Sequence, residues 1–292
     1  IGERIRASWG ADELSLYGRF DFILAKDGTP KILEFNADTP TSLLEASVIQ
    51  WQWKEDVFPE CDQFNGIHEG LVQSWKDIFP KKGEIHFAGA LENNEDTGTL
   101  QYLASTAMEA GFSTRVLDMQ ALDLQNGRFF DPAGELVNRC FKLYPWEWMV
   151  DESPDGCLAE MEWLEPIWKL VMSNKAILAT LYELFPDSPY VLPCYLSRPR
   201  SGLFCKKPVF SREGHNVSVV DIRDWEEYVR IAETEGDYNT GAYVYQEYVE
   251  PTAYSGRYPV IGSWIIGGEA AGICIRENRM EVTDNLSEFV PH

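Results

Sequence analysis

The chain has 292 residues, of which 45% are hydrophobic and 13% aromatic. A disordered chain carries less apolar material, and the length allows one large or two medium domains with cores of their own. Asp and Glu outnumber Lys and Arg by 47 to 25, which gives a formal net charge of −22. Because such a surface repels phosphate backbones and anionic lipids, neither nucleic acid nor a membrane is expected as a partner.

Cysteine and histidine usage argues against zinc chemistry and secretion. The six cysteines have no CxxC spacing, and the four histidines form no zinc pattern with them. No apolar run reaches membrane-spanning length, and no basic-then-apolar leader opens the chain. We therefore expect a cytoplasmic protein with reduced thiols. Since the first residue is Ile1, a longer parent chain stays an open alternative.

The first expected elements are two strands within residues 17–37, joined by a loop of Asp27 and Gly28. Asp-Gly between apolar-rich strands is a strong signal for a β-hairpin. With a two-residue loop, Asp21 lies opposite Glu34, and two opposed carboxylates destabilise a hairpin unless a positive group lies between them.

The following elements alternate between helix and strand. Helices are expected within 41–79 and at 99–110, and strands at 85–91, 112–117 and 139–144, which indicates an α/β layer. The acidic, proline-containing stretch 151–156 is expected to connect two lobes, residues 1–155 and 156–292. In the second lobe we expect helices at 158–172, 175–184 and 223–234, strands at 203–210 and 243–249, and a hairpin at 258–276 around Gly267 and Gly268.

The first hairpin offers oxygen ligands of the kind that Mg²⁺ prefers. On one face of it lie Asp21, Glu34 and Asn36, with Arg19 opposite Asn36. Two carboxylates and an amide oxygen suit magnesium, and an arginine beside them can hold a phosphate oxygen. A surface ladder of arginine and carboxylates explains the same residues equally well from the hairpin alone.

Two lysines and a small loop indicate where a polyphosphate could bind. Lys175 stands at a helix start and Lys207 in a strand, although each taken singly is more simply a solvated lysine. Lys207 leads into a loop at 212–214 whose backbone N–H groups could cradle phosphates. The strand that ends at 246–249 could read an adenine edge. Walker A and GxGxxG motifs are absent, which excludes the common P-loop and Rossmann sites.

In this order the motifs resemble those of the ATP-grasp ligases. The magnesium hairpin precedes the lysines, and this permuted order is similar to that of the glutathionylspermidine synthase-like acid–amine ligases. The motifs that carry the resemblance are Tyr17-Gly-Arg-Phe-Asp-Phe22, Leu33-Glu-Phe-Asn-Ala-Asp-Thr-Pro-Thr41, Ser173-Asn-Lys-Ala-Ile-Leu178, Lys207-Pro208, Arg212-Glu-Gly214, Gly272-Ile-Cys-Ile-Arg276 and Phe289-Val-Pro-His292.

The resemblance implies an α/β (α+β) protein with a permuted ATP-grasp fold, a pre-ATP-grasp-like first lobe and a nucleotide-binding second lobe. It implies an ATP-dependent ligase that joins a small-molecule carboxylate to an amine through an acyl phosphate, without an amidase domain. The site residues that it implies are Asp21, Glu34 and Asn36 for magnesium, with two ions, Lys175, Lys207, Glu213, Gly214, Gln246, Glu247, Tyr248 and Val249 for ATP, Arg19 for phosphate, and Arg212 and Arg276 for the acid or its acyl phosphate.

The identity of the acid and the amine stays open. Thr39 and Thr41 stand where the bifunctional members of this family have serines, so glutathione is not implied as the acid. An acidic loop at 92–96 suits a polyamine, but a solvated loop explains it more simply. Two other functions stay open as well: a nucleotide-binding module without turnover, and a permuted peptide ligase that uses an amino acid as the amine.

Overall fold

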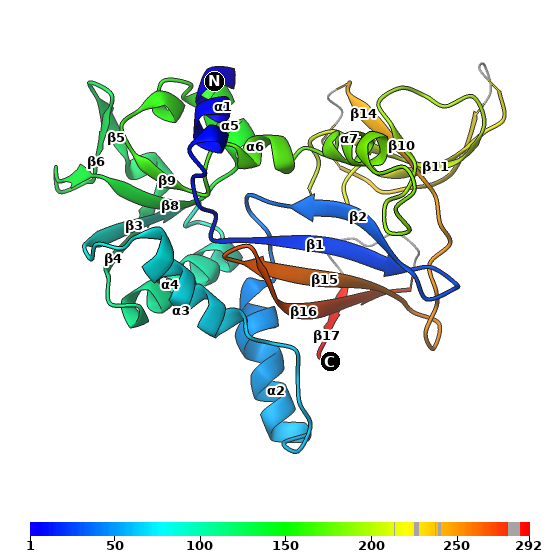
Figure 1. Ribbon diagram of the computed structural model, residues 1–292, viewed down its shortest axis with the longest axis horizontal. Coiled ribbons are helices and arrows are strands. Elements are labelled where there is room, and N and C mark those ends of the chain that lie inside the picture. Colours follow the sequence, from blue (N-terminus) through cyan, green and yellow to red (C-terminus); the bar gives the residue numbers. More distant parts are fainter. Residues whose placement is uncertain (213, 225–227, 237, 239–240, 280–286) are drawn as a thin grey trace. The chain divides into compact units, whose positions relative to one another are not determined.

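The computed structural model describes residues 1–212, 214–224, 228–236, 238, 241–279 and 287–292 (Figure 1). The chain divides into two compact units. Unit 1 contains Ile1–Arg19, Asn36–Leu170 and Trp264–Ile273, and unit 2 contains Phe20–Phe35, Val171–Ser263 and Cys274–His292. The mixed α/β class is confirmed. The stretch 151–156 lies inside unit 1, and the assignment of separate roles to residues 1–155 and 156–292 stays a prediction.

A parallel sheet forms the centre of unit 1. Its strands β3 (Glu84–Gly89), β4 (Ser113–Asp118), β8 (Arg139–Leu143) and β9 (Glu162–Leu164) lie in the order β4-β3-β8-β9. Helix α4 (Asn94–Glu109) connects β3 to β4 and packs on both, while α3 (Ile67–Ile78) packs on α4 (Figure 1). This is the strand–helix–strand layer that the alternating pattern predicts.

Aromatic side chains fill the space between this sheet and its helices. Trp75 of α3, Phe87 of β3 and Phe141 of β8 are completely buried, with ring centroids 5.5–6.2 Å apart. The Trp75 indole N–H donates to Thr106 Oγ1 at 2.9 Å, so its polar atom has a partner inside the core. Side chains on both sides of a parallel strand are buried in this way, which explains why four consecutive residues of β8, Cys140–Leu143, are all buried.

Unit 1 also contains elements that the sequence analysis did not assign. They are α1 (Gly2–Gly10), the three-stranded sheet of β5 (Asp123–Gln125), β6 (Arg128–Phe130) and β7 (Leu136–Val137), and α5 (Trp146–Glu152). The helical region expected within 41–79 is confirmed as a π-helical turn Glu45–Ile49 that continues into α2 (Gln50–Val57), followed by α3.

An antiparallel sheet forms the centre of unit 2. Its strands lie in the order β10-β14-β11-β12-β13, with bounds β10 (Cys194–Tyr195), β14 (Tyr243–Glu247), β11 (Gly202–Pro208), β12 (Ser218–Ile222) and β13 (Tyr228–Glu233). Helix α7 (Ile177–Leu184) packs on β10 and β14. The predicted strands at 203–210 and 243–249 and the helix at 175–184 are therefore confirmed.

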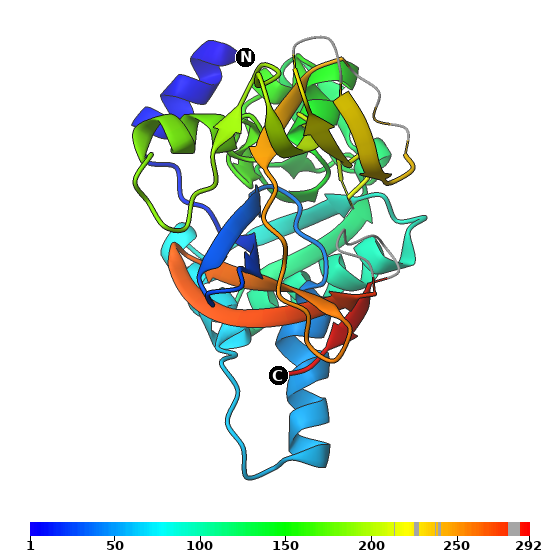
Figure 2. The same cartoon turned by 90° about the vertical axis from the view of Figure 1, so that its right-hand side faces the viewer.

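A second five-stranded sheet contains both predicted hairpins. Its order is β17-β16-β15-β1-β2, with bounds β1 (Tyr17–Leu24), β2 (Pro30–Asn36), β15 (Tyr258–Ile266), β16 (Glu269–Asn278) and β17 (Glu288–Val290). Strands β15 and β16, orange to red in Figure 2, are long and strongly curved, and Gly267 and Gly268 connect them with positive φ. The rings of Phe20 and Phe35 stack with centroids 4.0 Å apart across β1 and β2.

The loop of the first hairpin differs from the expected two-residue turn. The Gly28 N–H donates to Ala25 O at 2.8 Å, and the Ala25 N–H donates to Thr29 O at 3.0 Å. Gly28 has φ +82°, the left-handed conformation that closes a three-residue hairpin loop. The Asp27 side chain accepts the Thr29 N–H at 2.9 Å, which favours this longer loop. Thr29 therefore pairs with Ala25, whereas a two-residue loop would pair it with Lys26.

Two predicted helices are wrong over part of their length. Within 158–172, only α6 (Lys169–Met172) and a short 3₁₀ turn at Gly156–Leu158 are helical, because β9 adds a buried strand to the parallel sheet. Within 223–234, Tyr228–Glu233 forms edge strand β13, which pairs with β12, and residues 225–227 lie outside the described residues. In both places pairing with a neighbouring strand overrides the local helical pattern.

Across the ranges that the structure describes, no helix combines the length and apolarity needed to cross a membrane.

The N-terminal cap of α4 gives a direct test of this fold. Asn93 accepts the Glu95 N–H at 2.9 Å. We expect Asn93→Ala to lower the free energy of unfolding by about 1 kcal/mol, because the N–H groups of Glu95 and Asp96 at the helix start lose this acceptor. Urea denaturation of the variant measures this. The neighbouring exposed Asn94 caps nothing, so Asn94→Ala is the matched control, and an equal loss in both variants would contradict the capping role.

Candidate functional site

The predicted magnesium carboxylates both form ion pairs inside unit 2. Asp21 of β1 is 2% exposed, and its Oδ2 lies 2.7 Å from Nη2 of Arg276 on β16. Glu34 of β2 is paired with Lys175, with 3.0 Å between Oε2 and Nζ. Strands β1 and β2 are neighbours in their sheet, so the two carboxylates come from adjacent strands. The structure thus brings each of them to a cation that the resemblance assigned to substrate or ATP.

Lys175 lies at the position that the sequence analysis assigned to it, two residues before α7. Its Nζ donates to Ser211 O at 2.6 Å in addition to the Glu34 contact, and its backbone N–H donates to Val209 O at 3.0 Å. The side chain is 8% exposed. This lysine is therefore a buried cation paired with a carboxylate, and not the solvated one that the sequence alone favoured.

Lys207 and Gln246 form a second buried pair. Lys207 Nζ donates to Gln246 Oε1 at 2.7 Å and to Leu33 O at 3.1 Å. Gln246 Nε2 donates to Ile32 O at 2.8 Å. The two side chains come from adjacent strands β11 and β14 and hold the backbone of β2, directly before Glu34.

The segment expected to read an adenine edge already uses part of its backbone. The Glu247 N–H donates to Pro193 O at 2.7 Å, and the Tyr248 N–H donates to Leu203 O at 2.9 Å. Val249 follows them and is partly exposed. In this geometry the two N–H groups donate within unit 2, so hydrogen bonds from them to a base stay a prediction.

The remaining predicted residues are placed as follows. In unit 1, Arg19 is 3% exposed, and its side chain donates a hydrogen bond to Thr41 O. Its guanidinium carbon lies 5.7 Å from the ring centroid of Trp264. Asn36 is the last residue of β2, and it is partly exposed. In unit 2, Arg212 O accepts the His215 N–H at 2.9 Å, which forms a turn that includes Gly214 at φ +70°. Glu213 lies outside the described residues.

The donor set fits magnesium by its chemistry. Asp21, Glu34 and Asn36 offer hard oxygen atoms, and Mg²⁺ at nucleotide sites usually takes one or two carboxylates and completes its shell with phosphate and water oxygens. Among the residues that the structure describes, no group of three or more His, Cys, Asp or Glu side chains could hold a metal by itself. Arg276 and Lys175 pair with the two carboxylates, and contacts of either cation with a phosphate stay a prediction.

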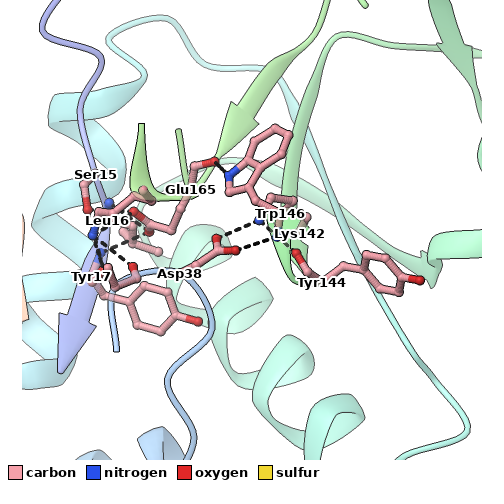
Figure 3. A network of polar contacts seen from close by, with 10 residues as sticks. Ser15, Leu16, Tyr17, Asp38, Lys142, Tyr144, Trp146 and Glu165 are labelled. Carbon is pink, nitrogen blue, oxygen red and sulfur yellow. Dashed lines mark hydrogen bonds and ion pairs between the residues drawn. The ribbon is translucent and has the colours of Figure 1, made fainter. Parts of the chain in front are cut away.

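Unit 1 contains a buried ionic network that the sequence motifs do not indicate, and Figure 3 shows it. Asp38 Oδ1 lies 2.7 Å from Lys142 Nζ, and Asp38 Oδ2 accepts the Trp146 N–H at 2.9 Å. Lys142 is completely buried and also donates to Tyr144 O at 2.8 Å. Burial lowers the pKa of the Lys142 ammonium, and Asp38 opposes that shift.

A second buried carboxylate lies in the same network. Glu165 is completely buried, and its Oε1 accepts the backbone N–H groups of Leu16 and Tyr17, both at 3.1 Å. Its Oε2 accepts the Ser15 hydroxyl at 2.6 Å. Burial raises the pKa of the Glu165 carboxyl, and Lys169 opposes that shift. A charged residue within an apolar run is the sequence signal that could have indicated these buried charges, as with Lys142 in Cys140-Phe-Lys-Leu143.

A family model described as glutathionylspermidine synthase preATP-grasp matches residues 1–292. The chain belongs to the glutathionylspermidine synthase family. The resemblance that the sequence motifs carried is thereby confirmed.

Two relatives within this family match nearly the whole chain. A Haemophilus influenzae protein, named provisionally as an acid–amine ligase, is 38% identical over 303 residues, which are 99% of this chain and 77% of the relative. The trypanothione synthetase of Crithidia fasciculata is 28% identical over 320 residues, which are 98% of this chain and 48% of that protein. The chain therefore spans about half the length of the trypanothione synthetase.

Among solved structures, a glutathione synthetase-like effector from Globodera pallida in its apo form is similar in fold. The TM-score is 0.59 at 10% sequence identity, with 98% of this chain and 78% of that chain covered. At 10% sequence identity, this similarity supports the fold of the present chain and carries no information on its function.

The Asp38–Lys142 pair generates a prediction about stability. We expect Asp38→Ala to lower the free energy of unfolding by about 3–5 kcal/mol, because it leaves the Lys142 charge buried without its carboxylate. The double variant Asp38→Asn, Lys142→Met removes both charges and should lose much less. Urea denaturation of the two variants measures the difference. If the double variant is as unstable as Asp38→Ala, uncompensated charge is not the cause.

Proposed function

We propose that this chain is an ATP- and Mg²⁺-dependent carbon–nitrogen ligase that joins a carboxylate to an amine through an acyl phosphate, on a permuted ATP-grasp fold. The family model and the ligase and synthetase names of the relatives support the class of reaction. The chain spans only part of the trypanothione synthetase, so the activity of the whole protein is part of the proposal.

The observation that carries the proposal is the pairing of predicted metal ligands with predicted phosphate ligands inside unit 2. Asp21 is paired with Arg276 at 2.7 Å, and Glu34 with Lys175 at 3.0 Å. Lys207 donates to the carbonyl of Leu33, the residue before Glu34. Cations and carboxylates fixed beside each other suit a ligand that is itself part cation and part anion, as a magnesium–nucleotide complex is.

The proposed reaction has two steps that need no protein nucleophile. First, a carboxylate oxygen of the acid attacks the γ-phosphorus of ATP, and the bond to the β-phosphate oxygen breaks, which releases ADP and leaves an acyl phosphate. Second, the amine nitrogen attacks the acyl carbon, the carbon–oxygen bond to phosphate breaks, and the nitrogen loses a proton. The products are an amide, ADP and inorganic phosphate.

In this mechanism the protein positions the reactants and stabilises negative charge. Lys175 and Lys207 would contact the nucleotide phosphates, and Arg19 a transferring phosphate oxygen. Arg212 and Arg276 would hold the acid and its acyl phosphate. Magnesium, held by Asp21, Glu34 and Asn36, would supply positive charge to the phosphate oxygens.

For the substrates we propose a peptide-like acid and a polyamine-like amine. The family description and the trypanothione synthetase name favour this class for the chain's relatives. The net charge of −22 favours attraction of a polycation to the surface, which acts on the encounter rate and not on the choice of amine.

ADP release tests the proposal. Magnesium-dependent ADP release should need one acid–amine pair from a panel of peptide acids and polyamines. We expect Asp21→Asn and Lys207→Met to lower the rate by about 100-fold or more, since each removes a charge placed at the reacting phosphates.

Two exposed residues of the same hairpin give matched controls. Lys26 forms an exposed ion pair with Glu250, and Asp27 lies in the turn. Lys26→Met and Asp27→Asn should leave the rate unchanged within about twofold. ATP binding without turnover for any pair would favour the nucleotide-binding module over the ligase.

A further inference from the structure

Lys169 lies at the open end of the β1–β2 hairpin. Its Nζ donates to Tyr17 O at 3.0 Å and to Ala37 O at 3.0 Å. Tyr17 is the first residue of β1, and Ala37 is the residue that follows β2. A single buried ammonium group, 2% exposed, therefore bonds the beginning of one strand and the end of the other.

Glu165 bonds the same end of β1 and also pairs with Lys169. It lies four residues before Lys169, between β9 and α6, with 3.5 Å between Oε2 and Nζ, and it accepts the N–H groups of Leu16 and Tyr17. The carboxylate and the ammonium thus hold both polar groups of the Tyr17 backbone. Because the pair is buried, each contact is made in a low dielectric, where a polar group that loses its partner is costly.

The positions held in this way are next to predicted site residues. Arg19 is two residues beyond Tyr17 on β1, so its side chain lies on the same face of the strand. Asn36 is bonded directly to Ala37. All of these residues belong to unit 1. A shift of the strand ends would move the Arg19 guanidinium and the Asn36 amide with them.

We propose that Lys169, paired with Glu165, is a positioning residue that fixes the open end of the hairpin and so sets the geometry of Arg19 and Asn36, the predicted phosphate and magnesium ligands of unit 1. This inference rests on the proposed function. Lys169 touches neither metal nor substrate in this assignment. It acts through the backbone of Tyr17 and Ala37, as partners of metal ligands act through the ligands.

The variant that tests the role must not leave a buried charge. Lys169→Met alone strands the Glu165 carboxylate, so we combine it with Glu165→Gln. The glutamine oxygen can still accept the Leu16 and Tyr17 N–H groups, while the bonds from Lys169 to Tyr17 O and Ala37 O are lost. Arg115→Met is the matched control, because Arg115 forms ion pairs with Asp131, Glu135 and Glu84 in unit 1 and, in the part of the chain that the structure describes, does not contact the hairpin.

Metal binding is measured directly, with Mn²⁺ as the probe in the presence of ADP, by electron paramagnetic resonance of the free ion. We expect the double variant to bind Mn²⁺ about 10-fold or more weakly than the unaltered chain. Its affinity for ADP without metal should stay within about twofold, since Lys175 and Lys207 lie in unit 2 and receive no bond from Lys169. Amide exchange at 17–24 and 30–36 should become faster, and exchange at 139–143 should not.

The outcomes separate the two proposals. Weaker Mn²⁺ binding and faster hairpin exchange in the double variant, with Arg115→Met unchanged in both, support the positioning role. Equal Mn²⁺ binding by the double variant and the unaltered chain overturns it while the proposed function stands. Equal weakening in Arg115→Met overturns it as well, because the loss is then general instability. If the unaltered chain binds neither Mn²⁺ nor ADP, the proposed function fails and the positioning role fails with it.

Discussion

A charge removed from water needs a partner, and this constraint governs both units of the protein. In unit 1 the completely buried Lys142 is held by Asp38, and the buried Glu165 is held by backbone N–H groups and Lys169. An unpaired charge in either position would cost several kcal/mol, so the network permits one arrangement of the segments that supply it. Those segments are the two ends of the β1–β2 hairpin, strand β8 and the chain around α6.

The same constraint acts differently in unit 2. Lys175 and Lys207 are at most 8% exposed, yet each is paired partly with neutral acceptors, Ser211 O for one and Gln246 for the other. Lys142 of unit 1 and Lys175 each combine one carboxylate with a backbone carbonyl, whereas both acceptors that the described residues offer to Lys207 are neutral. The charge of Lys207 can therefore attract a further anion. In the proposed function, that anion is a phosphate of the nucleotide.

Much of the fold was predictable where local pattern and tertiary environment agree. The two hairpins, the strand–helix–strand layer around α4, and the strand that contains Lys207 are confirmed. The errors lie where a strand formed by pairing alone, as at β9 and β13, and where the Asp27 side chain and Gly28 changed the length of a turn. Neither a pairing partner distant in the sequence nor a turn hydrogen bond can be read from residue periodicity.

The sequence by itself determined the family, because the order and spacing of the Arg19–Asp21, Glu34–Asn36, Lys175 and Lys207 motifs depend on residue identity and not on their arrangement in space. It also determined which side chains offer hard oxygen ligands and which carry positive charge. Only the tertiary structure decided that Asp21 meets Arg276 across 255 positions of the chain, and that Lys169 bonds the two ends of one hairpin. The physical reason is that a charge takes its partner from whichever segment folding brings near it, and burial then fixes that choice.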